Sequence, residues 1–268
     1  MTMQLNKLVD MAARNVVITG AAGHLGRVIA ATFADLGANL ILVDKVADGL
    51  DFLESNLNAT RRVNILKIQC DLADQRNRED LLAEIKSHVT QVNCLVNNAS
   101  FVGTDAVDGW AESFERQSLS AWRQCLEVGL TAPFHLCQGL LNELRQGVGS
   151  NIINISSIYG LVGPDWSLYE GTKMASPAAY AASKGALNQL TRWMATTLAP
   201  AVRVNAIAPG GIARDQPQTF TTKYALRTPL GRMASEDDFR GAVAFLGTDA
   251  GRYVTGQVIS VDGGWCVW

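Results

Sequence analysis

The sequence of 268 residues lacks long apolar runs and any marked excess of charge. No stretch approaches the roughly 20 consecutive apolar residues that a membrane-spanning helix needs. The net charge is only −2, so the composition does not indicate a nucleic acid or an acidic membrane surface as a partner. The first 15 residues contain no apolar segment of the kind found in secretory signals. We therefore expect a cytoplasmic protein.

Recognisable metal-binding patterns are also missing. The chain has five cysteines and three histidines, and they form no C-x-x-C or H-E-x-x-H pattern. Most of the cysteines stand in apolar segments, where reduced core thiols are expected. We predict that the protein has no metal site.

What the sequence does contain is a regular alternation of apolar runs and amphipathic stretches. The apolar runs predict buried strands at residues 16–19, 39–44, 64–70, 92–98, 151–156, 202–208 and 257–261. Helices are predicted near 24–36, 48–58, 77–88, 119–146, 177–199 and 235–247. This order predicts an α/β fold, a single Rossmann-type doubly wound domain over residues 1–268 with about seven parallel strands and helices on both faces. Three long irregular stretches, 99–118, 158–176 and 209–234, are candidate substrate loops.

A glycine-rich turn separates the first strand from the first helix. Gly20, Gly23 and Gly26 leave room for a pyrophosphate at the helix N-terminus, where free N–H groups favour an anion. Asp44 ends the second strand about 20 residues later, which is the spacing of a carboxylate that accepts from a ribose. A carboxylate repels a 2′-phosphate, so the pattern favours NAD over NADP, although Lys45 next to it weakens this preference.

Two segments place a tyrosine four residues before a lysine, YAASK at 180–184 and YEGTK at 169–173. Ser176 and Pro177 are typical of a helix N-cap and first turn, so Tyr180 and Lys184 should lie on one face of a helix. A nearby cation lowers the pKa of a phenol and suits it to acid–base chemistry. Gly171 interrupts the other pair, which should lie in a loop. We therefore prefer Tyr180 as the reactive phenol.

These segments together resemble the short-chain dehydrogenase/reductase family over essentially the whole chain. The matching motifs, in family order, are TGAAGHLG (19–26), Asp44, CDLAD (70–74), NNAS (97–100), ISSIYG (155–160), YAASK (180–184), NAIAPGGI (205–212) and TGQVISVDGG (255–264). The resemblance implies hydride transfer between NAD or NADP and an alcohol or carbonyl carbon. It also implies a homotetramer or homodimer that pairs the long helices.

The resemblance further implies a role for individual residues. Tyr180 would be the general acid/base, Lys184 would lower its pKa and bind the nicotinamide ribose, and Ser157 would hydrogen-bond the substrate oxygen. The other implied cofactor contacts are Gly20, Gly23, His24, Leu25, Gly26, Asp44, Asp71, Leu72, Asn98, Ala99, Pro209, Gly210 and Ile212.

Four departures from the family pattern stand out. His24 replaces a small residue of the glycine turn, and Arg214 replaces a threonine that often ends the P-G loop. Gly129 stands where members usually carry an asparagine that holds a water in a proton relay. An insertion, residues 161–178, lengthens the chain between Ser157 and Tyr180.

Polar residues in the insertion and the following loop suggest an oxygen-rich substrate. Tyr169, Glu170 and Arg214 are candidate substrate contacts beside Ser157. The YEGT, RDQP and DGGWCVW segments resemble a sugar-related branch associated with flagellin modification, nonulosonic-acid synthesis and gluconate dehydrogenation. We predict a carbohydrate derivative as substrate. The alternatives are a 3-oxoacyl-carrier-protein reductase and, because of Gly129, a non-enzymatic NAD-binding sensor or scaffold.

Overall fold

The computed structural model describes residues 4–101 and 107–268, and its centre is one parallel sheet. The seven strands lie in the order β3-β2-β1-β4-β5-β6-β7, and every neighbouring pair is parallel. Their bounds are β1 Asn15–Thr19, β2 Asn39–Asp44, β3 Ile65–Gln69, β4 Cys94–Asn97, β5 Asn151–Ile155, β6 Arg203–Pro209 and β7 Val258–Val261. The predicted doubly wound α/β fold and its seven strands are confirmed.

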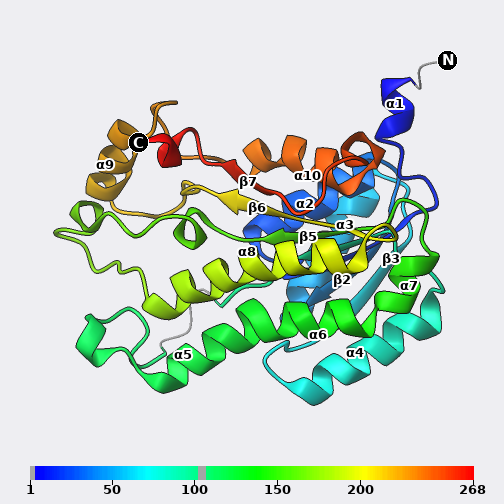
Figure 1. The fold of residues 1–268 in the computed structure, drawn as a ribbon, viewed down its shortest axis with the longest axis horizontal. Coiled ribbons are helices and arrows are strands. Elements are labelled where there is room, and N and C mark those ends of the chain that lie inside the picture. The colour runs from blue at the N-terminus through cyan, green and yellow to red at the C-terminus, as the bar shows by residue number, and fades with distance from the viewer. Residues whose placement is uncertain (1–3, 102–106) are drawn as a thin grey trace.

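The order of the strands determines where a ligand can bind. The chain runs outward from β1 to β3 and then returns to place β4 on the other side of β1. In an open parallel sheet, ligands bind beyond the carboxyl ends of the strands at such a reversal. Figure 1 shows the loop after β5, helix α9 and the C-terminal segment gathered at one end of the molecule, far from helix α1.

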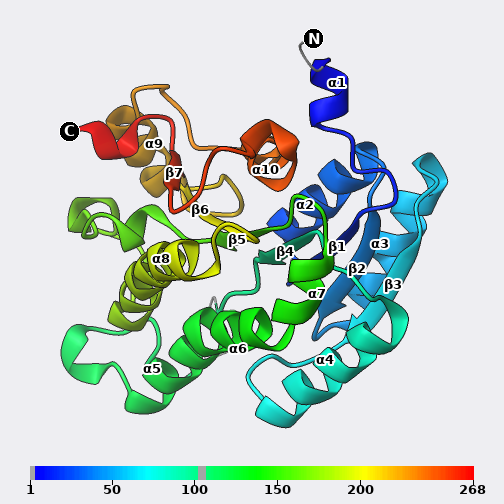
Figure 2. The same ribbon diagram turned by 45° about the vertical axis from the view of Figure 1, so that its right-hand side comes forward.

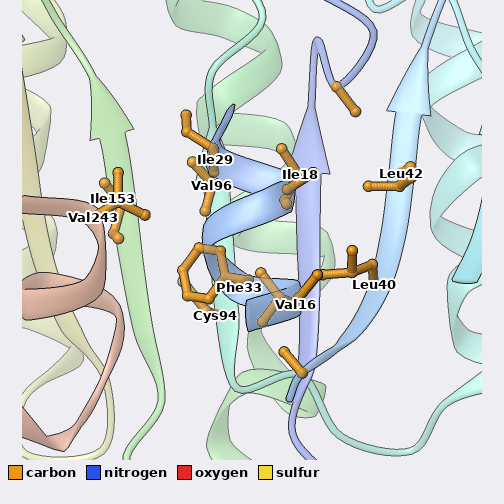
Figure 3. Packing of buried hydrophobic residues seen from close by; sticks show 14 of the residues in the cluster. Val16, Ile18, Ile29, Phe33, Leu40, Leu42, Cys94, Val96, Ile153 and Val243 are labelled. Carbon is orange, nitrogen blue, oxygen red and sulfur yellow. The ribbon is translucent and has the colours of Figure 1, made fainter. Parts of the chain in front are cut away.

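One face of the sheet is covered by α2 (His24–Asp35), α3 (Ala47–Thr60) and α10 (Arg240–Gly247). Ile29 and Phe33 of α2 and Val243 of α10 pack on the side chains of β1, β2, β4 and β5 (Figure 3). These side chains are almost completely removed from water. Their burial is the main source of stability on this face.

The opposite face is covered by α4 (Gln75–His88), α6 (Ala132–Gly139), α7 (Leu141–Gln146) and α8 (Ala178–Leu198). Figure 2 shows these helices on the side of the sheet away from α2 and α10. Leu81 of α4, Leu136 of α6 and Met194 of α8 fill this second core. Helix α8 thereby fixes the catalytic candidates of its first turns against the sheet.

The long helix predicted over 119–146 is interrupted, so this prediction was wrong in detail. The structure contains α5 (Leu119–Leu126), a π-helical turn η2 (Glu127–Thr131), α6 and α7. Gly129 in the π-helical turn packs against the side chain of Ser183 in α8. A π-helical turn inserts one extra residue and changes the direction of the side chains that follow.

The start of helix α8 also differs from the expectation. Pro177 is the N-cap residue, and the first N–H of the helix, that of Ala178, donates to the side-chain oxygen of Gln117 at 3.0 Å, whereas Ser176 was expected to cap the helix. The predicted helix at 235–247 begins instead with a 3₁₀ turn, η5 (Glu236–Phe239), before α10. The short helix α1 (Leu5–Leu8) was not predicted.

The stretch 209–234, predicted as irregular, contains helix α9 (Gln218–Arg227). This helix packs on the insertion: Arg227 forms an ion pair with Asp165 at 3.0 Å, and Lys223 donates to the carbonyl of Ser167 at 2.6 Å. The rings of Tyr169 and Phe220 meet edge to face at 5.5 Å. In the part of the chain that the structure describes, no helix is long and apolar enough to cross a membrane.

Candidate active site

The turn between β1 and α2 needs glycine at two positions. Gly20 has a φ of +63°, and a Cβ at this residue would lie 2.8 Å from the Cα of Ala99. A Cβ on Gly26 would lie 2.1 Å from the carbonyl oxygen of Gly20. Neither position can hold a side chain without movement of the backbone. Gly20 therefore keeps the turn close to the residues after β4, and Gly26 lets α2 approach the turn.

The N-terminus of α2 presents free donors. Its N-cap residue, Gly23, has no side chain to cap the helix. Within residues 4–101 and 107–268, the N–H groups of His24, Leu25 and Gly26 have no hydrogen-bond acceptor. Free N–H groups at a helix N-terminus favour a phosphate. The turn thus fits a dinucleotide pyrophosphate, to which the exposed His24 would contribute through its backbone.

The carboxylate of Asp44 is held in a fixed position beside this turn. Its Oδ2 accepts from the N–H of Ala22 at 2.9 Å, and its Oδ1 accepts from the N–H of Val46 at 3.1 Å. Each carboxylate oxygen can accept a second hydrogen bond. Asp44 can therefore still accept from the hydroxyls of a ribose.

A pocket of about 270 Å³ opens beside Asp44. Asp71, Leu72 and Ala99 line it, as does Gly20. These residues come from the ends of four different strands, and the sequence had assigned all of them to the cofactor. The structure brings them together in one place.

Arg78 supports the wall of this pocket. Its side chain is almost completely buried and donates to the carbonyl oxygen of Leu72 at 2.5 Å. The same guanidinium contacts Glu127 of the π-helical turn at 2.7 Å and the Nδ1 of His135 at 3.1 Å. Arg78 thus ties the loop after β3 to the helices behind it.

Asn98 and Ala99 hold the end of β4 against the glycine turn. The side-chain amide of Asn98 donates to the carbonyl oxygens of Thr19 and Gly20, at 2.9 and 3.0 Å. The N–H groups of Asn98 and Ala99 both donate to the hydroxyl of Thr19. Asn98 therefore shapes the turn, and Ala99 contributes to the surface of the pocket.

Pro209 ends β6, and Gly210 and Ile212 follow it at the same edge of the sheet. The N–H of Gly210 donates to Val261 at 3.0 Å. The carbonyl of Ile212 accepts from Gln216 at 2.8 Å, while its N–H has no acceptor in the part of the chain that the structure describes. This free N–H fits the cofactor contact that the family resemblance implied for Ile212.

Tyr180 and Lys184 lie on one face of α8, one turn apart. The Nζ of Lys184 donates to the carbonyl oxygen of Ile155 at 2.8 Å, and it lies 5.6 Å from the centre of the Tyr180 ring. Lys184 is only 2% exposed. The sheet and the helix therefore hold the ammonium group in one position beside the phenol.

Ser157 follows β5, and its hydroxyl is oriented by the backbone. Its Oγ accepts from the N–H of Tyr159 at 3.1 Å, which leaves the hydroxyl proton free to be donated. Gly160, at the end of the same turn η3 (Ile158–Gly160), allows this turn to approach α8. A Cβ on Gly160 would lie 2.7 Å from the carbonyl carbon of Lys184.

Burial changes the acidity of Lys184 and Tyr180. It lowers the pKa of Lys184 to about 8, because the charged form loses water. It also raises the pKa of Tyr180, although a hydrogen bond with Ser157 and the charge of Arg214 act in the opposite direction. The phenol of the free protein is therefore protonated at neutral pH.

Gly129, in place of the usual asparagine, has a packing reason. A Cβ at this buried position would lie 3.1 Å from the Oγ and 3.3 Å from the Cβ of Ser183. Ser183 stands directly before Lys184 and donates to the carbonyl of Tyr180 at 2.8 Å. A larger residue at 129 would press on the part of α8 that carries both groups.

The candidate substrate residues are only partly brought together. Tyr169 is half-buried, and its hydroxyl is hydrogen-bonded to that of Tyr159 at 2.5 Å. The exposed Glu170 pairs with Lys223 at 3.4 Å, on the outer side of the insertion. Arg214 pairs with Glu236 at 3.2 Å. Tyr169 therefore adjoins the Ser157 turn directly, whereas Glu170 faces α9.

Comparison with known proteins decides the family. The family model described as enoyl-(acyl carrier protein) reductase matches residues 20–266. Galactitol 2-dehydrogenase (L-tagatose-forming) of Cereibacter sphaeroides is 33% identical over 94% of each chain. The 2-dehydro-3-deoxy-D-gluconate 5-dehydrogenase of Pseudoalteromonas atlantica is 32% identical over 93% of this chain and 94% of its own. This chain belongs to the short-chain dehydrogenase/reductase family.

Solved structures of the family agree with this assignment. The NADP complex of RhlG from Pseudomonas aeruginosa has a TM-score of 0.84 at 26% identity, covering 98% of this chain and 99% of its own. A short-chain dehydrogenase from Leptospira borgpetersenii with bound NAD+ has a TM-score of 0.83 at 27% identity, covering 99% and 96%. As a short-chain dehydrogenase/reductase, the protein is an oxidoreductase that uses NAD or NADP on an alcohol or carbonyl group.

Some residues of this short-chain dehydrogenase/reductase site were missed in the sequence. Arg78 is recognisable only from its contacts, because an arginine on an amphipathic helix usually faces water. Tyr159 stands two residues after Ser157, and this proximity was the available signal. The pocket beside Asp44 is also lined by Val43, Lys45, Cys70, Ala73, Ser100, Phe101, Gln124 and Val128.

Proposed function

We propose that this protein interconverts an alcohol and a carbonyl in a sugar or sugar-acid derivative, with Tyr180 as the acid/base and NAD as the preferred cofactor. The observation that carries this proposal is the arrangement of Tyr180, Lys184 and Ser157 at the carboxyl ends of the strands. Lys184 bonds to the last residue of β5 and Ser157 follows that strand, while the turn whose free N–H groups fit a pyrophosphate follows β1 at the same edge of the sheet. The whole chain would act as one NAD(P)-binding domain.

The residues supply proton transfer and orientation. Ser157 would donate its hydroxyl proton in a hydrogen bond to the substrate oxygen, since its Oγ already accepts from Tyr159. Tyr180 would give a proton to that oxygen in reduction and take one from it in oxidation. Lys184, fixed by Ile155, would stabilise the phenolate and donate to the nicotinamide ribose. The bound nicotinamide supplies or accepts the hydride.

The acidity of Tyr180 favours one direction of the reaction. Because burial raises its pKa, the phenol holds its proton at neutral pH and is ready to act as an acid. Reduction of a carbonyl should therefore be the faster direction near pH 7. Oxidation of an alcohol should accelerate as the pH rises and the fraction of phenolate increases.

Replacement of the phenol tests the assignment of Tyr180. Tyr180→Phe should bind NADH as the unchanged protein does and lose turnover by about 10²- to 10⁴-fold, because it removes one proton donor. Fluorescence titration with NADH and a rate assay at 340 nm would measure the two effects. The matched control is Tyr169→Phe in the competing YEGTK segment. Full activity in Tyr180→Phe together with an inactive Tyr169→Phe would exchange the two assignments.

The position of Asp44 supports NAD as the preferred cofactor. Its fixed carboxylate lines the pocket and would repel a 2′-phosphate. We expect NADH to bind at least tenfold more tightly than NADPH, and Asp44→Ser to lose most of this difference. Fluorescence titration of both proteins with both cofactors measures it. Tighter binding of NADPH to the unchanged protein would contradict the proposal.

A substrate panel separates the remaining functions. Turnover of polyols, sugars or sugar acids would support the proposed function. Preference for a 3-oxoacyl thioester would identify a 3-oxoacyl-carrier-protein reductase. Binding of NADH without turnover of any alcohol, ketone or acyl substrate would favour a sensor or scaffold.

A further inference from the structure

A second pocket lies between the insertion (residues 161–178) and the segment that precedes α5. Its volume is about 580 Å³. One wall is made by residues 111–114, 116 and 117, and the other by Trp166, Tyr169, Lys173 and Ser176. Ala178 and Ala181 of helix α8, on either side of Tyr180 in the sequence, form its floor. The pocket therefore adjoins the helix turn that carries the proposed acid/base.

Tyr169 connects this pocket to the catalytic centre. It lines the pocket, and its hydroxyl is hydrogen-bonded to that of Tyr159. The N–H of Tyr159 in turn donates to the Oγ of Ser157. Tyr169 is also close enough for its field to raise the pKa of Tyr180. A substrate with its reacting carbon at Ser157 and Tyr180 could extend past Tyr169 into the pocket.

One cationic side chain of the pocket, Lys173, has no acidic counterpart among the described residues of the lining. Glu112 and Arg116 form an ion pair with each other at 3.0 Å. Lys173 is exposed, and it forms no ion pair with any residue in 4–101 or 107–268. Among the residues that the structure describes, no other charged side chain lines the pocket. The net charge of the lining among these described residues is thus +1, located at Lys173.

A buried hydroxyl and an aromatic wall accompany this cation. Ser176 is only 7% exposed and lies near the Tyr169 phenol, but its Oγ makes no hydrogen bond of good geometry within the described chain. A buried hydroxyl without a partner is costly, and it would readily donate a hydrogen bond to a ligand oxygen. Trp166, half-exposed at 57%, packs on Tyr169 with a ring distance of 5.7 Å. Such aromatic surfaces suit the apolar C–H face of a sugar chain.

We propose that this pocket binds the carboxylate end of an open-chain sugar acid, with Lys173 as its counter-ion and Ser176 as a hydrogen-bond partner. The inference rests on the proposed function, because it places the other end of the same substrate at Tyr180. A neutral polyol of the same length could hydrogen-bond to Ser176, but it would leave the charge of Lys173 without a counter-ion. The pocket therefore selects the acid over the polyol.

Binding to the NADH complex of Tyr180→Phe, measured by calorimetry, tests this site without requiring turnover. The probes are D-gluconate and D-glucitol, which have the same six-carbon chain and differ in the carboxylate. We expect gluconate to bind more tightly and Lys173→Met to weaken it about 10- to 100-fold, the loss that removal of a charged hydrogen bond produces. Glucitol binding should change less than twofold, and Lys173→Arg should restore most of the gluconate affinity.

A distant exposed lysine provides the control. Lys86→Met on α4 should leave the binding of both probes unchanged. Gluconate affinity that does not change in Lys173→Met, or a failure of gluconate to bind at all, would overturn the inference. In a third outcome, Lys173→Met loses gluconate binding, but the unchanged protein turns over no sugar acid. This result would support the binding pocket and overturn the proposed function. The two proposals therefore fail separately.

Discussion

The buried ammonium of Lys184 links activity, stability and pH at a single residue. Its pKa of about 8 lies below the value of about 10.4 expected in an unfolded chain. Between these two values the unfolded chain binds more protons than the folded chain, so this residue makes stability rise as the pH rises. Below pH 8 the folded protein bears the whole cost of burying the charge.

Replacement of Lys184 separates these effects. Lys184→Met should lose turnover, and at pH 7 it should be at least as stable as the unchanged protein. Its free energy of unfolding should not show the rise between pH 8 and about 10 that Lys184 causes in the unchanged protein. Urea unfolding at several pH values measures this slope. Lys86→Met, which removes an exposed lysine, should keep it. An identical slope in Lys184→Met and the unchanged protein would show that the buried ammonium does not titrate in this range.

The residues of the site could be predicted largely because local motifs carry them. Gly20 and Ser157 follow strands, Asp44 ends a strand, and parallel strands bring such ends to one edge. Tyr180 lies in the first turn of the predicted helix α8. Ser176 could not be assigned correctly from its position alone. Its hydroxyl turns toward Tyr169 rather than capping α8, and only the packing of the insertion determines this.

At the scale of elements, the contact between the Ser157 turn and α8 depends on Gly160. The nearest atoms to a Cβ there are the carbonyl carbon of Lys184 at 2.7 Å and the Nδ2 of Asn188 at 2.8 Å. Backbone atoms cannot move aside easily, so a methyl group should push the turn away from the helix. The distance between Ser157 and Tyr180 would then increase.

Two glycine variants test this contact. Gly160→Ala should lower turnover at least tenfold, reduce the free energy of unfolding by about 1–3 kcal/mol and leave NADH affinity nearly unchanged. Gly163→Ala, in the adjoining insertion, is the matched control because a Cβ there would meet nothing within 4 Å. Rate assays, urea unfolding and NADH titration give the three readouts. Equal turnover in the two variants would show that the close approach is not needed.

Sequence patterns predicted best those elements in which burial determines the order of apolar and polar residues. Strands β1, β2, β4 and β5 are nearly continuous apolar runs because helices cover both faces of the sheet. The break at Glu127–Thr131 has no such signature, because it depends on the contact of Gly129 with Ser183. Helix α9 was missed because polar residues dominate its sequence and the insertion supplies its partner surface.

At the scale of the whole molecule, an apolar face on α6 and α8 remains open to water. Phe134 is 43% exposed and Trp193 is 56% exposed, and Leu130 and Leu190 lie in the same surface depression. Exposed apolar surface of this kind marks an interaction site. We propose that a second copy of the chain covers it, as the family resemblance suggested for the long helices.

A charge at the centre of this face should prevent association. Trp193→Glu should shift the molar mass in sedimentation equilibrium from a dimer or tetramer to a smaller species, because the carboxylate would lose its water in the interface. The control is Tyr253→Glu, which changes a fully exposed aromatic residue away from this face. A monomeric unchanged protein, or an oligomer that persists in Trp193→Glu, would contradict the proposal.

The contacts between the insertion and α9 have a consequence for how specificity can change in this protein. Asp165 with Arg227, Ser167 with Lys223, and Tyr169 with Phe220 join the two segments, although α8 and β6 separate them in the sequence. If the insertion alone were replaced by that of a relative, Arg227 would lose its ion pair with Asp165, and Phe220 would lose its contact with the ring of Tyr169. The transferable unit for redesign is therefore the pair of segments, and evolutionary changes in one should be accompanied by changes in the other.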